Sequence, residues 1–329
     1  MSSNDTPLLR VDNLSVHFSS RGSWLLNEPT YTYALNDVSL EAHQGEIVGI
    51  VGESGCGKST LGRSILRLNT PTEGAIQFQG QDITQLRDRE LRQIRKDIQI
   101  VFQDPLASLN PRMTIRSMLF EAMSFHNVVA ADKREARAAW LLELCGLNPD
   151  ALDRYPHEFS GGQRQRIGIA RALSVSPKLL IADEPVSALD MSIQAQLLNL
   201  LYSLKREFDL TIIFISHDMK VVEHFCDRIY VMYYGTMVEH LPARRLKSDA
   251  RHPYTQGLLE AIPPDHPSER RSTVPISGEV PSPHQKPRGC AFATRCPLSV
   301  ESCGHSTPSS ERLGLDHQVA CPVVVHHTH

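Results

Sequence analysis

Gly52-Glu53-Ser54-Gly55-Cys56-Gly57-Lys58-Ser59-Thr60 is the stretch of sequence that decides the fold class. It follows the apolar run from Glu46 to Val51, which is typical of a buried parallel strand, and it precedes a helical segment. The spacing G-x-x-x-x-G-K-[ST] in this context is that of a phosphate-binding loop. A glycine-rich turn without a ligand is the alternative, but strand, loop, lysine and hydroxyl all favour the phosphate interpretation.

Each residue type in this loop suits an anionic ligand. The glycines let backbone N–H groups turn inward, and the helix N-terminus adds partial positive charge. We expect Lys58 to reach the β- and γ-phosphates of a nucleotide, Ser59 to ligate Mg²⁺ and Thr60 to contact a nearer phosphate. The whole loop from Gly52 to Thr60 is therefore the predicted nucleotide-binding segment.

A second apolar strand, residues 179–182, ends in two carboxylates, Asp183 and Glu184. Ligands of open α/β sheets bind at the C-terminal ends of the strands. We expect Asp183 to hold Mg²⁺ through water and Glu184 to polarise an attacking water. Two acids after a strand can also simply cap the next helix, but beside a phosphate loop the catalytic interpretation is favoured.

Strand and helix patterns alternate along the chain, which predicts an α/β domain with a largely parallel sheet. A helical pattern without strands, residues 104–174, predicts a helical insertion. The other predicted elements are strands at residues 8–18, 34–42, 98–102, 211–215 and 229–233, a loop at 19–32, and helices at 82–97 and 193–204.

Length and composition narrow the class of protein. A chain of 329 residues, 41% of them hydrophobic, can form two domains, or one large domain with an appendage. Its net charge of −3 argues against nucleic acid as a partner. No apolar run approaches the roughly 20 residues that cross a bilayer, and Met1 to Arg10 show no signal-peptide pattern. We therefore expect a soluble, cytoplasmic chain.

The segment Phe159-Ser160-Gly161-Gly162-Gln163-Arg164-Gln165-Arg166 resembles the signature motif of ATP-binding cassette (ABC) ATPases. From the residues alone, Ser160 and Gln163 form a capping-box pattern at the start of a helix, and that helix end can bind an anion. The resemblance implies that Ser160, Gly161, Gly162 and Gln163 close on the γ-phosphate of ATP held by a partner subunit. A well-capped helix without a ligand is the alternative.

Further elements resemble that family in the expected order. Gln103, after the strand at 98–102, matches the Q-loop, which implies contact with Mg²⁺ and the attacking water and a loop that faces a membrane subunit. Ser187-Ala188-Leu189-Asp190 matches the D-loop, and His217 matches the switch histidine that contacts the γ-phosphate. A lone histidine is more often structural, but its place after these motifs favours a catalytic role.

An aromatic ring near the first strand stacks on adenine in the family. Phe18 fits best because it lies at the end of a predicted strand, and Tyr33 and Tyr31 are alternatives. Phe18 can instead be a core residue.

The C-terminal part resembles the ATPase subunits of dipeptide and oligopeptide importers, of the second or "F" type. The matching segments are Arg251–Leu259 (RHPYTQGLL), Ile276–Pro283, Gly289–Phe292 and Arg295–Pro297. The resemblance implies a heterodimer with a paralogous ATPase subunit, two permeases and an extracytoplasmic solute-binding protein. It also implies a peripheral location on the cytoplasmic face of the inner membrane.

Four of the seven cysteines fall at the C-terminal end of the chain, with the spacing C-x5-C-x6-C-x17-C: Cys290, Cys296, Cys303 and Cys321. Disulfides are not expected in a reducing cytoplasm. Four thiolates can hold zinc or an iron–sulfur cluster, although the C-x2-4-C pairs of zinc sites are absent. The importer resemblance implies a [4Fe–4S] cluster, and free cysteines are the remaining alternative.

These observations predict an ABC ATPase cassette at residues 1–258, with a P-loop NTPase fold and a helical subdomain at about 104–174. Residues 259–329 are predicted to be a small extension, with a proline-rich arm at 262–289. The predicted function is ATP hydrolysis that powers di- or oligopeptide import. Alternative solutes are nickel, glutathione and opines. Less favoured alternatives are a non-transport ABC ATPase and an iron–sulfur sensor built on a cassette.

Overall fold

A computed structural model describes residues 6–20, 30–262, 276, 278, 281–314 and 316–326. The chain divides into two compact units, and each is described by itself. The first comprises Met1–Ala42, Ile47–Thr84 and Ser216–His329, and the second comprises His43–Glu46 and Gln85–Ile215. The domain boundary near residue 258 stays a prediction.

The first unit contains a mainly antiparallel sheet of order β2-β1-β4-β5. Strands β1 (Leu9–Ser20) and β2 (Thr30–Ala42) form a long pair, and β4 (Glu73–Phe78) and β5 (Gln81–Asp82) continue the sheet. The predicted loop at 19–32 is too long, because Ser20 and Thr30 still pair across the two strands. Alternation of buried and exposed residues along β2 explains why the sequence pattern located the strand.

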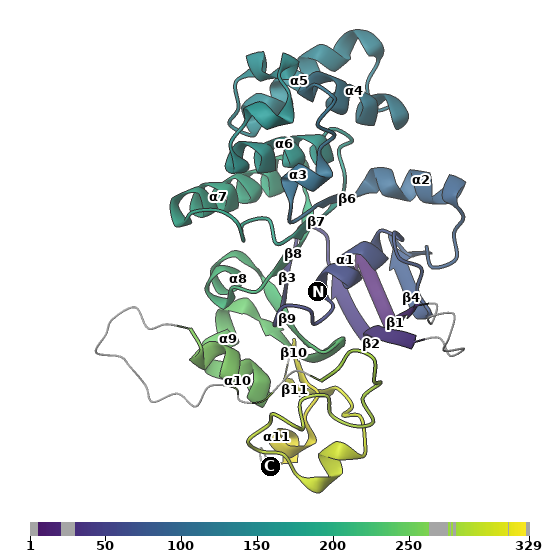
Figure 1. The fold of residues 1–329 in the computed structure, drawn as a ribbon, viewed down its shortest axis with the longest axis vertical. Coiled ribbons are helices and arrows are strands. Elements are labelled where there is room, and N and C mark those ends of the chain that lie inside the picture. The colour runs from purple at the N-terminus through teal and green to yellow at the C-terminus, as the bar shows by residue number, and fades with distance from the viewer. Residues whose placement is uncertain are drawn as a thin grey trace. The chain divides into compact units, whose positions relative to one another are not determined.

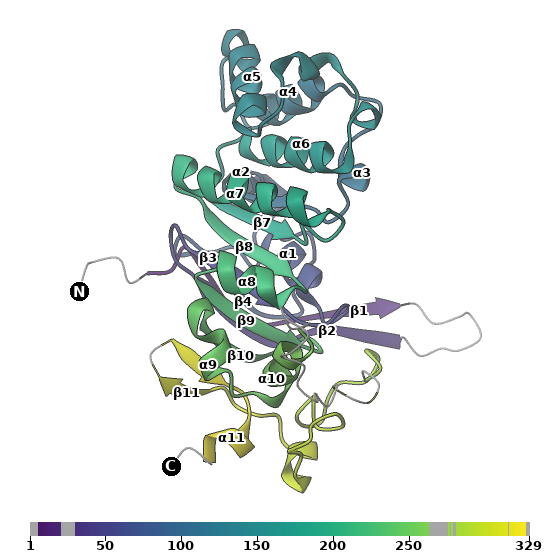
Figure 2. The ribbon, with the colours of Figure 1, turned by 90° about the vertical axis from the view of Figure 1, so that its left-hand side faces the viewer.

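The same unit contains a second run of strands in the order β11-β12-β10-β9-β3. Every residue of β3 (Ile47–Val51) is buried, and β3 runs parallel to β9 (Arg228–Tyr233). The next strands, β10 (Thr236–Pro242), β12 (His317–Val319) and β11 (Glu311–Gly314), pair in antiparallel fashion (Figure 2). The helices are α1 (Lys58–Ile65), α8 (Met219–Phe225), α9 (Leu246–Asp249), α10 (Pro253–Glu260) and α11 (Pro322–His326).

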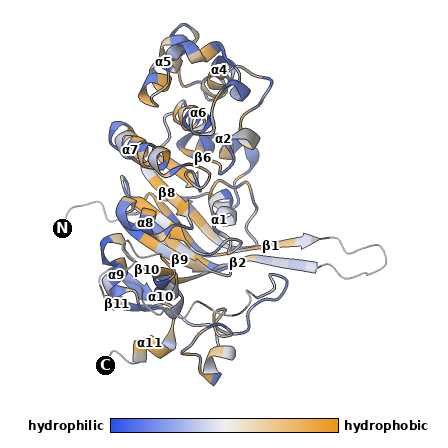
Figure 3. Ribbon diagram, turned by 60° about the vertical axis from the view of Figure 1, so that its left-hand side comes forward, coloured by the Kyte–Doolittle hydropathy of each residue, from blue (hydrophilic) through white to orange (hydrophobic). Residues whose placement is uncertain are grey.

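The second unit contains the parallel strands β6 (Ile98–Val101), β7 (Leu179–Asp183) and β8 (Thr211–Ser216, which ends at the boundary between the units). Strand β8 is buried along its length, and its central residues, Ile212 to Ile215, are hydrophobic (Figure 3). The helical pattern predicted at 104–174 is confirmed, and α4, α5 and α6 lie together (Figure 1). Helices of this unit are α2 (Asp88–Asp97), α3 (Pro105–Ser108), α4 (Ile115–Phe125), α5 (Arg134–Leu144), α6 (Gly161–Leu173) and α7 (Met191–Phe208).

The helix predicted at 82–97 is wrong at its start, because α2 begins only at Asp88. Asp82 lies in β5, and its carboxylate accepts a hydrogen bond from the backbone N–H of Thr84. The hydroxyl of Thr84 in turn accepts from the N–H of Ile76. These side-chain bonds form a turn, which replaces the first turns of the predicted helix.

Short 3₁₀ segments complete the two units, at Ala131–Lys133, Pro149–Asp153, Pro156–Glu158, Ala243–Arg245 and Glu301–Gly304. Across the described ranges, no helix combines the length and the apolar character that a bilayer crossing requires. Most of the predicted proline-rich arm, residues 263–275, 277, 279 and 280, lies outside the described residues.

Candidate functional site

The phosphate loop in the first unit depends on two glycines. Gly52 has a φ of 154° and Gly57 a φ of 106°. A Cβ atom on Gly52 would stand 2.0 Å from the carbonyl oxygen of Met232, and one on Gly57 would stand 2.5 Å from that of Ala34. Only glycine fits both the backbone angles and the space. The loop therefore lies directly against the backbone of β9 and β2.

Lys58 is buried and turned back on its own loop. Its Nζ donates to the carbonyl oxygens of Gly52, at 2.8 Å, and Glu53, at 2.9 Å. The helix α1 starts at Lys58 after Gly57, and among the described residues no side chain caps this helix end. Ser59 and Thr60 occupy the next two positions, half-buried. Backbone N–H groups at such a helix end suit a phosphate ligand.

Cys56, inside the loop, is buried. Burial raises the pKa of its thiol, although the nearby Lys58 ammonium acts in the opposite direction. A neutral, buried thiol is a poor nucleophile, so we expect Cys56 to be a small loop residue without chemistry of its own. Ser54 and Gly55, at the loop tip, are exposed.

His217 and the aromatic candidates also lie in the first unit. His217 is exposed and follows β8, in a turn where the N–H of Asp218 donates to the hydroxyl of Ser216. Phe18 has 43% of its surface exposed, which excludes the alternative that it is a core residue. Tyr31 is exposed as well, whereas the half-buried Tyr33 ring meets His17 edge-on at 4.7 Å between ring centroids.

The second unit brings two predicted catalytic residues together. Gln103 follows β6 and Glu184 follows β7, and the Gln103 amide Nε2 donates to the Glu184 carboxylate at 3.0 Å. Glu184 has a φ of 46° and its N–H donates to the carbonyl of Ile215 on β8, which fixes the turn after β7. Asp183, the last residue of β7, is 2% exposed. An amide and two carboxylates thus lie at the C-terminal ends of adjacent parallel strands, where such sheets bind ligands.

The predicted capping box at the start of α6 is confirmed. The Gln163 N–H donates to the Ser160 hydroxyl at 3.3 Å, and the Ser160 N–H donates to the Gln163 side-chain oxygen at 3.0 Å. Ser160 and Gly161 are exposed, whereas Gly162 is buried against Ile193 of α7. The first turn of α6 therefore presents exposed backbone that a ligand can approach.

Asp190, from the predicted D-loop, is the residue before α7. It is exposed, and within the described residues its side chain does not cap that helix. The turn before it is fixed by Ser187, whose hydroxyl donates to the Glu184 carbonyl at 3.1 Å. The D-loop is thus joined directly to the residue that follows β7.

Two residues with no predicted role contact the phosphate loop. The Arg295 guanidinium forms a bidentate ion pair with the Glu53 carboxylate, at 2.8 and 3.0 Å. The Glu53 N–H donates to the Tyr254 hydroxyl at 2.8 Å. Hydrogen bonding to Glu53 raises the pKa of Arg295 above its usual range. The only sequence signal for a role of these two residues was weak: both lie in segments that resemble the ATPase subunits of peptide importers.

The four C-terminal cysteines have the donor chemistry of a metal site. Burial, followed by the charges of the other three thiols, raises the pKa of Cys290 to about 11. Burial and the charges of Cys321 and Cys303 also raise the pKa of Cys296. The four thiols are thus electrostatic neighbours, yet among the described residues no three His, Cys, Asp or Glu side chains are arranged to hold one metal ion. The cluster stays a prediction.

Comparisons with known proteins bear on this arrangement. The family described as "ABC transporter" matches residues 35–187, and "Oligopeptide/dipeptide transporter, C-terminal region" matches residues 238–303. The oligopeptide transport ATP-binding protein AppF of Bacillus subtilis is 48% identical over 97% of this chain and 98% of its own. The chain belongs to the ABC transporter ATP-binding proteins.

Other comparisons agree with this membership. A putative peptide import ATP-binding protein of Brucella ovis is 47% identical to this ABC protein, over 96% of this chain and 98% of its own. The solved structure of the dimeric ATP-binding cassette MJ0796 with ADP and Pi has a TM-score of 0.64 and 31% identity, covering 72% of this chain and 99% of that one. The solved structure of CbiO1 from Clostridium perfringens has a TM-score of 0.63 and 27% identity, covering 75% of this chain and 92% of that one. The predicted P-loop NTPase cassette fold is confirmed, and the chain is an ABC ATPase.

Proposed function

We propose that this ABC ATPase powers the import of di- or oligopeptides through a membrane transporter. The observation that carries the proposal is the C-terminal region: residues 238–303 match the oligopeptide/dipeptide transporter family. Relatives named for oligopeptide transport and for peptide import match the chain over nearly its whole length. Nickel, glutathione or opine import is the alternative, since the cassette does not contain the solute path.

The proposed reaction is in-line attack of water on the γ-phosphorus of ATP. A bond forms from the water oxygen to phosphorus, and the bond from phosphorus to the β,γ-bridging oxygen breaks, which releases ADP and inorganic phosphate. Glu184 polarises the water, and Gln103, whose amide already contacts Glu184, orients it. Lys58, the loop N–H groups and His217 balance the negative charge that develops on the phosphates.

Mg²⁺ is the metal that this chemistry uses, because it neutralises charge on the β- and γ-phosphates. The residues proposed to hold it are Ser59, Gln103 and Asp183. Their donors are a hydroxyl, an amide and a carboxylate, the oxygen ligands that Mg²⁺ prefers. Asp183 is almost fully buried at the end of β7, so its carboxylate has a fixed position from which it can hold Mg²⁺ through water.

We propose that Ser160, Gly161, Gly162, Gln163 and Asp190 act on ATP bound to a second cassette. The sequence contains one phosphate loop and one signature segment, and similar cassettes have been solved as dimers. The exposed first turn of α6 supports this assignment. The proposed partners are a paralogous ATPase subunit, two permeases and an extracytoplasmic binding protein. The proposed location is peripheral, on the cytoplasmic face of the inner membrane.

For the adenine ring, we propose stacking on an aromatic side chain of the β1–β2 pair. The exposure of Phe18 supports it over the half-buried Tyr33, and the equally exposed Tyr31 is the alternative. A Phe18→Ala variant that binds ATP as tightly as the unaltered chain would exclude Phe18.

A [4Fe–4S] cluster on Cys290, Cys296, Cys303 and Cys321 is a further proposal. Its support is the donor set of four thiols, two of which, Cys290 and Cys296, have a pKa raised by burial and by the neighbouring thiols. The cluster would supply a structural or regulatory centre outside the ATP motifs. Analysis of iron and acid-labile sulfide in anaerobically purified protein tests it, with a Cys145→Ser variant as a control outside the cysteine motif. Folded, iron-free protein would contradict it.

The transport proposal is tested by uptake in cells. Genes for the whole transporter are expressed in a strain that lacks peptide import, and uptake of labelled dipeptides, longer peptides, glutathione, opines and nickel is measured. Peptide uptake that disappears with Lys58→Ala is the expected result. Uptake of another solute alone would assign the alternative function. ATP hydrolysis without uptake of any of these solutes, together with purification on ribosomes, would favour a non-transport ABC ATPase.

A further inference from the structure

Glu53, the second residue of the phosphate loop, is held at three points. Its carboxylate accepts hydrogen bonds from both Nη atoms of Arg295, at 2.8 and 3.0 Å. Its N–H donates to the Tyr254 hydroxyl at 2.8 Å, and its carbonyl oxygen accepts from Lys58 Nζ at 2.9 Å. Side chain, donor and acceptor of one loop residue are therefore all engaged. Two of these contacts come from segments more than 200 positions away in the sequence.

Arg295 is placed for a strong interaction. Its side chain is 6% exposed, against 28% for Glu53, so the pair is largely screened from water. The guanidinium also donates to the Tyr233 hydroxyl at 3.3 Å. Tyr233, Tyr254 and Phe292 meet one another at 4.7 to 5.3 Å between ring centroids and form an apolar wall around it. A bidentate pair in such surroundings is rigid and directional.

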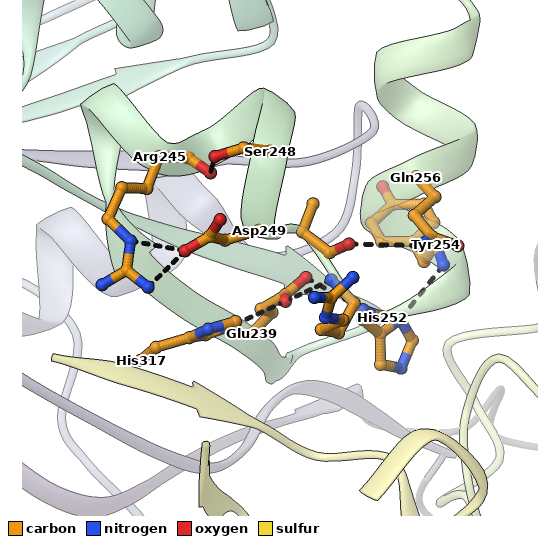
Figure 4. Close-up of polar contacts among 10 residues, drawn as sticks. Glu239, Arg245, Ser248, Asp249, His252, Tyr254, Gln256 and His317 are labelled. Atoms are coloured by element: carbon orange, nitrogen blue, oxygen red, sulfur yellow. Dashed lines mark hydrogen bonds and ion pairs between the residues drawn. The ribbon is translucent and has the colours of Figure 1, made fainter. Parts of the chain in front are cut away.

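Tyr254 is itself fixed by a buried polar network around Glu239 (Figure 4). The Glu239 carboxylate, on β10, accepts from the N–H groups of Arg251 and His252, at 2.7 and 3.1 Å, and contacts His317 Nε2 of β12 at 2.9 Å. His252 Nδ1 then accepts from the Tyr254 N–H at 3.1 Å. This network sets the start of α10 and hence the position of the Tyr254 hydroxyl.

We propose that Arg295 and Tyr254 are positioning residues for ATP binding, which act through Glu53 on the shape of the phosphate loop. The loop lowers the free energy of bound phosphate only if its N–H groups already point inward, and the contacts on Glu53 restrict the backbone at that point. The proposal rests on the ATPase activity of the family and not on the transported solute. The competing interpretation is that the same contacts only fasten the C-terminal segments to the cassette.

A double-mutant cycle on the full chain separates these interpretations. Arg295→Gln, Glu53→Gln and the double variant are compared for the ATP KM, kcat and Tm. If Arg295 acts through Glu53, each single variant raises KM about tenfold, the size of one lost hydrogen bond to a charged group, with kcat nearly unchanged. The double variant then has the same KM as either single one, because the interaction is already lost.

Tyr254→Phe provides a second test that keeps the aromatic wall intact. It removes only the acceptor of the Glu53 N–H, and we expect KM to rise about threefold. Matched controls are Arg288→Gln, an exposed arginine seven positions before Arg295, and Tyr202→Phe, an exposed tyrosine of α7. Both should keep the KM of the unaltered chain. If Arg295→Gln does not fold, Glu53→Gln and Tyr254→Phe still decide the question.

Two results would overturn the proposal for Arg295, and a third would overturn it for Tyr254. A lower Tm with unchanged KM in Arg295→Gln would show that the contact only fastens the C-terminal segments. Additive changes in KM in the double variant would show that Arg295 does not act through Glu53. An unchanged KM in Tyr254→Phe would remove Tyr254 from the set. Absence of ATP hydrolysis by the unaltered chain would instead contradict the assigned ATPase activity.

Discussion

Helix α1 follows a glycine-rich loop and helix α6 begins with two glycines, and among the described residues these two helix starts are built in opposite ways. Helix α1 follows Gly57, whose φ is 106° and which has no room for a Cβ atom beside the carbonyl of Ala34. Helix α6 follows Ser160, which forms a capping box with Gln163, and a Cβ on Gly161 would have no described atom within 4 Å.

The difference concerns where each helix end obtains its shape. The phosphate loop takes its conformation from its surroundings: the backbones of β2 and β9, the Lys58 side chain and the contacts on Glu53. The start of α6 satisfies its own N–H groups with local side chains. The loop before α1 therefore depends on tertiary contacts, whereas the start of α6 is stabilised by local sequence without a ligand.

The largest expected effect separates ATP binding, the role proposed for both helix ends, from ATP hydrolysis. Glu184→Gln should reduce steady-state ATP hydrolysis by about 10²–10⁴, because it removes the general base. ATP binding should remain, since neither helix end is altered. Nucleotide titration and phosphate-release assays measure the two quantities. Hydrolysis at the unaltered rate would refute the role of Glu184, and Glu143→Gln, an exposed glutamate of α5, serves as the control.

Matched glycine substitutions test the comparison directly. Gly57→Ala forces a Cβ to within 2.5 Å of a carbonyl oxygen at a positive φ, so we expect a loss of about 1–3 kcal/mol in stability and weak ATP binding. Gly161→Ala meets no neighbour and should leave the Tm of the full chain within a few degrees or raise it. Thermal unfolding with and without ATP measures both. Equal effects of the two substitutions would show that the start of α1 does not depend on tertiary contacts more than the start of α6 does.

Acid should weaken the surroundings of the phosphate loop. Burial lowers the pKa of His240 and of His252 to about 4, against an ordinary value of 6.5. The folded state holds these imidazoles neutral. Their contribution to the free energy of unfolding is therefore complete above pH 6.5 and is lost as pH falls from 6.5 toward 4. One pKa unit corresponds to about 1.4 kcal/mol. Hydrogen exchange at pH 7 and pH 5 should show protection lost from β10 and α10 more than from α6.

The histidine origin of that pH dependence has its own control. His240→Gln should flatten the change in Tm between pH 7 and pH 5, whereas His224→Gln, at an exposed site, should not. A similar slope in both variants would assign the acid sensitivity to other groups.

The smallest expected effect concerns the capping box. Ser160→Ala removes the acceptor for the Gln163 N–H, and loss of such a cap costs about 1 kcal/mol of stability. The expected result is a Tm lower by a few degrees, with ATP binding to the phosphate loop of the same chain unchanged. Ser203→Ala, at an exposed position within α7, is the control. A change in ATP affinity of the single chain would show that the helix end of α6 affects the phosphate loop.

Local features of the site could be predicted from the sequence. The strand, glycine loop and helix around Lys58, the carboxylates after β7 and the capping box of α6 can all be recognised from residues within a few positions of one another. Hydrophobic periodicity likewise located the buried strands and the helical segment. One error in a helix boundary also has a local cause. The predicted start of α2 was wrong because the Asp82–Thr84 turn replaces the first turns of the helix.

The sequence by itself determined where the phosphate loop lies, the order of the ABC motifs and the capping of α6, because motif spacing, local capping residues and periodicity can be read from short stretches of chain. Only the tertiary structure decided that Glu53 pairs with Arg295, which lies 242 positions away, and donates to Tyr254. A charge pair between distant residues leaves no periodic pattern in the chain. Its strength comes from burial beside three aromatic rings, and that burial exists only once the chain has folded.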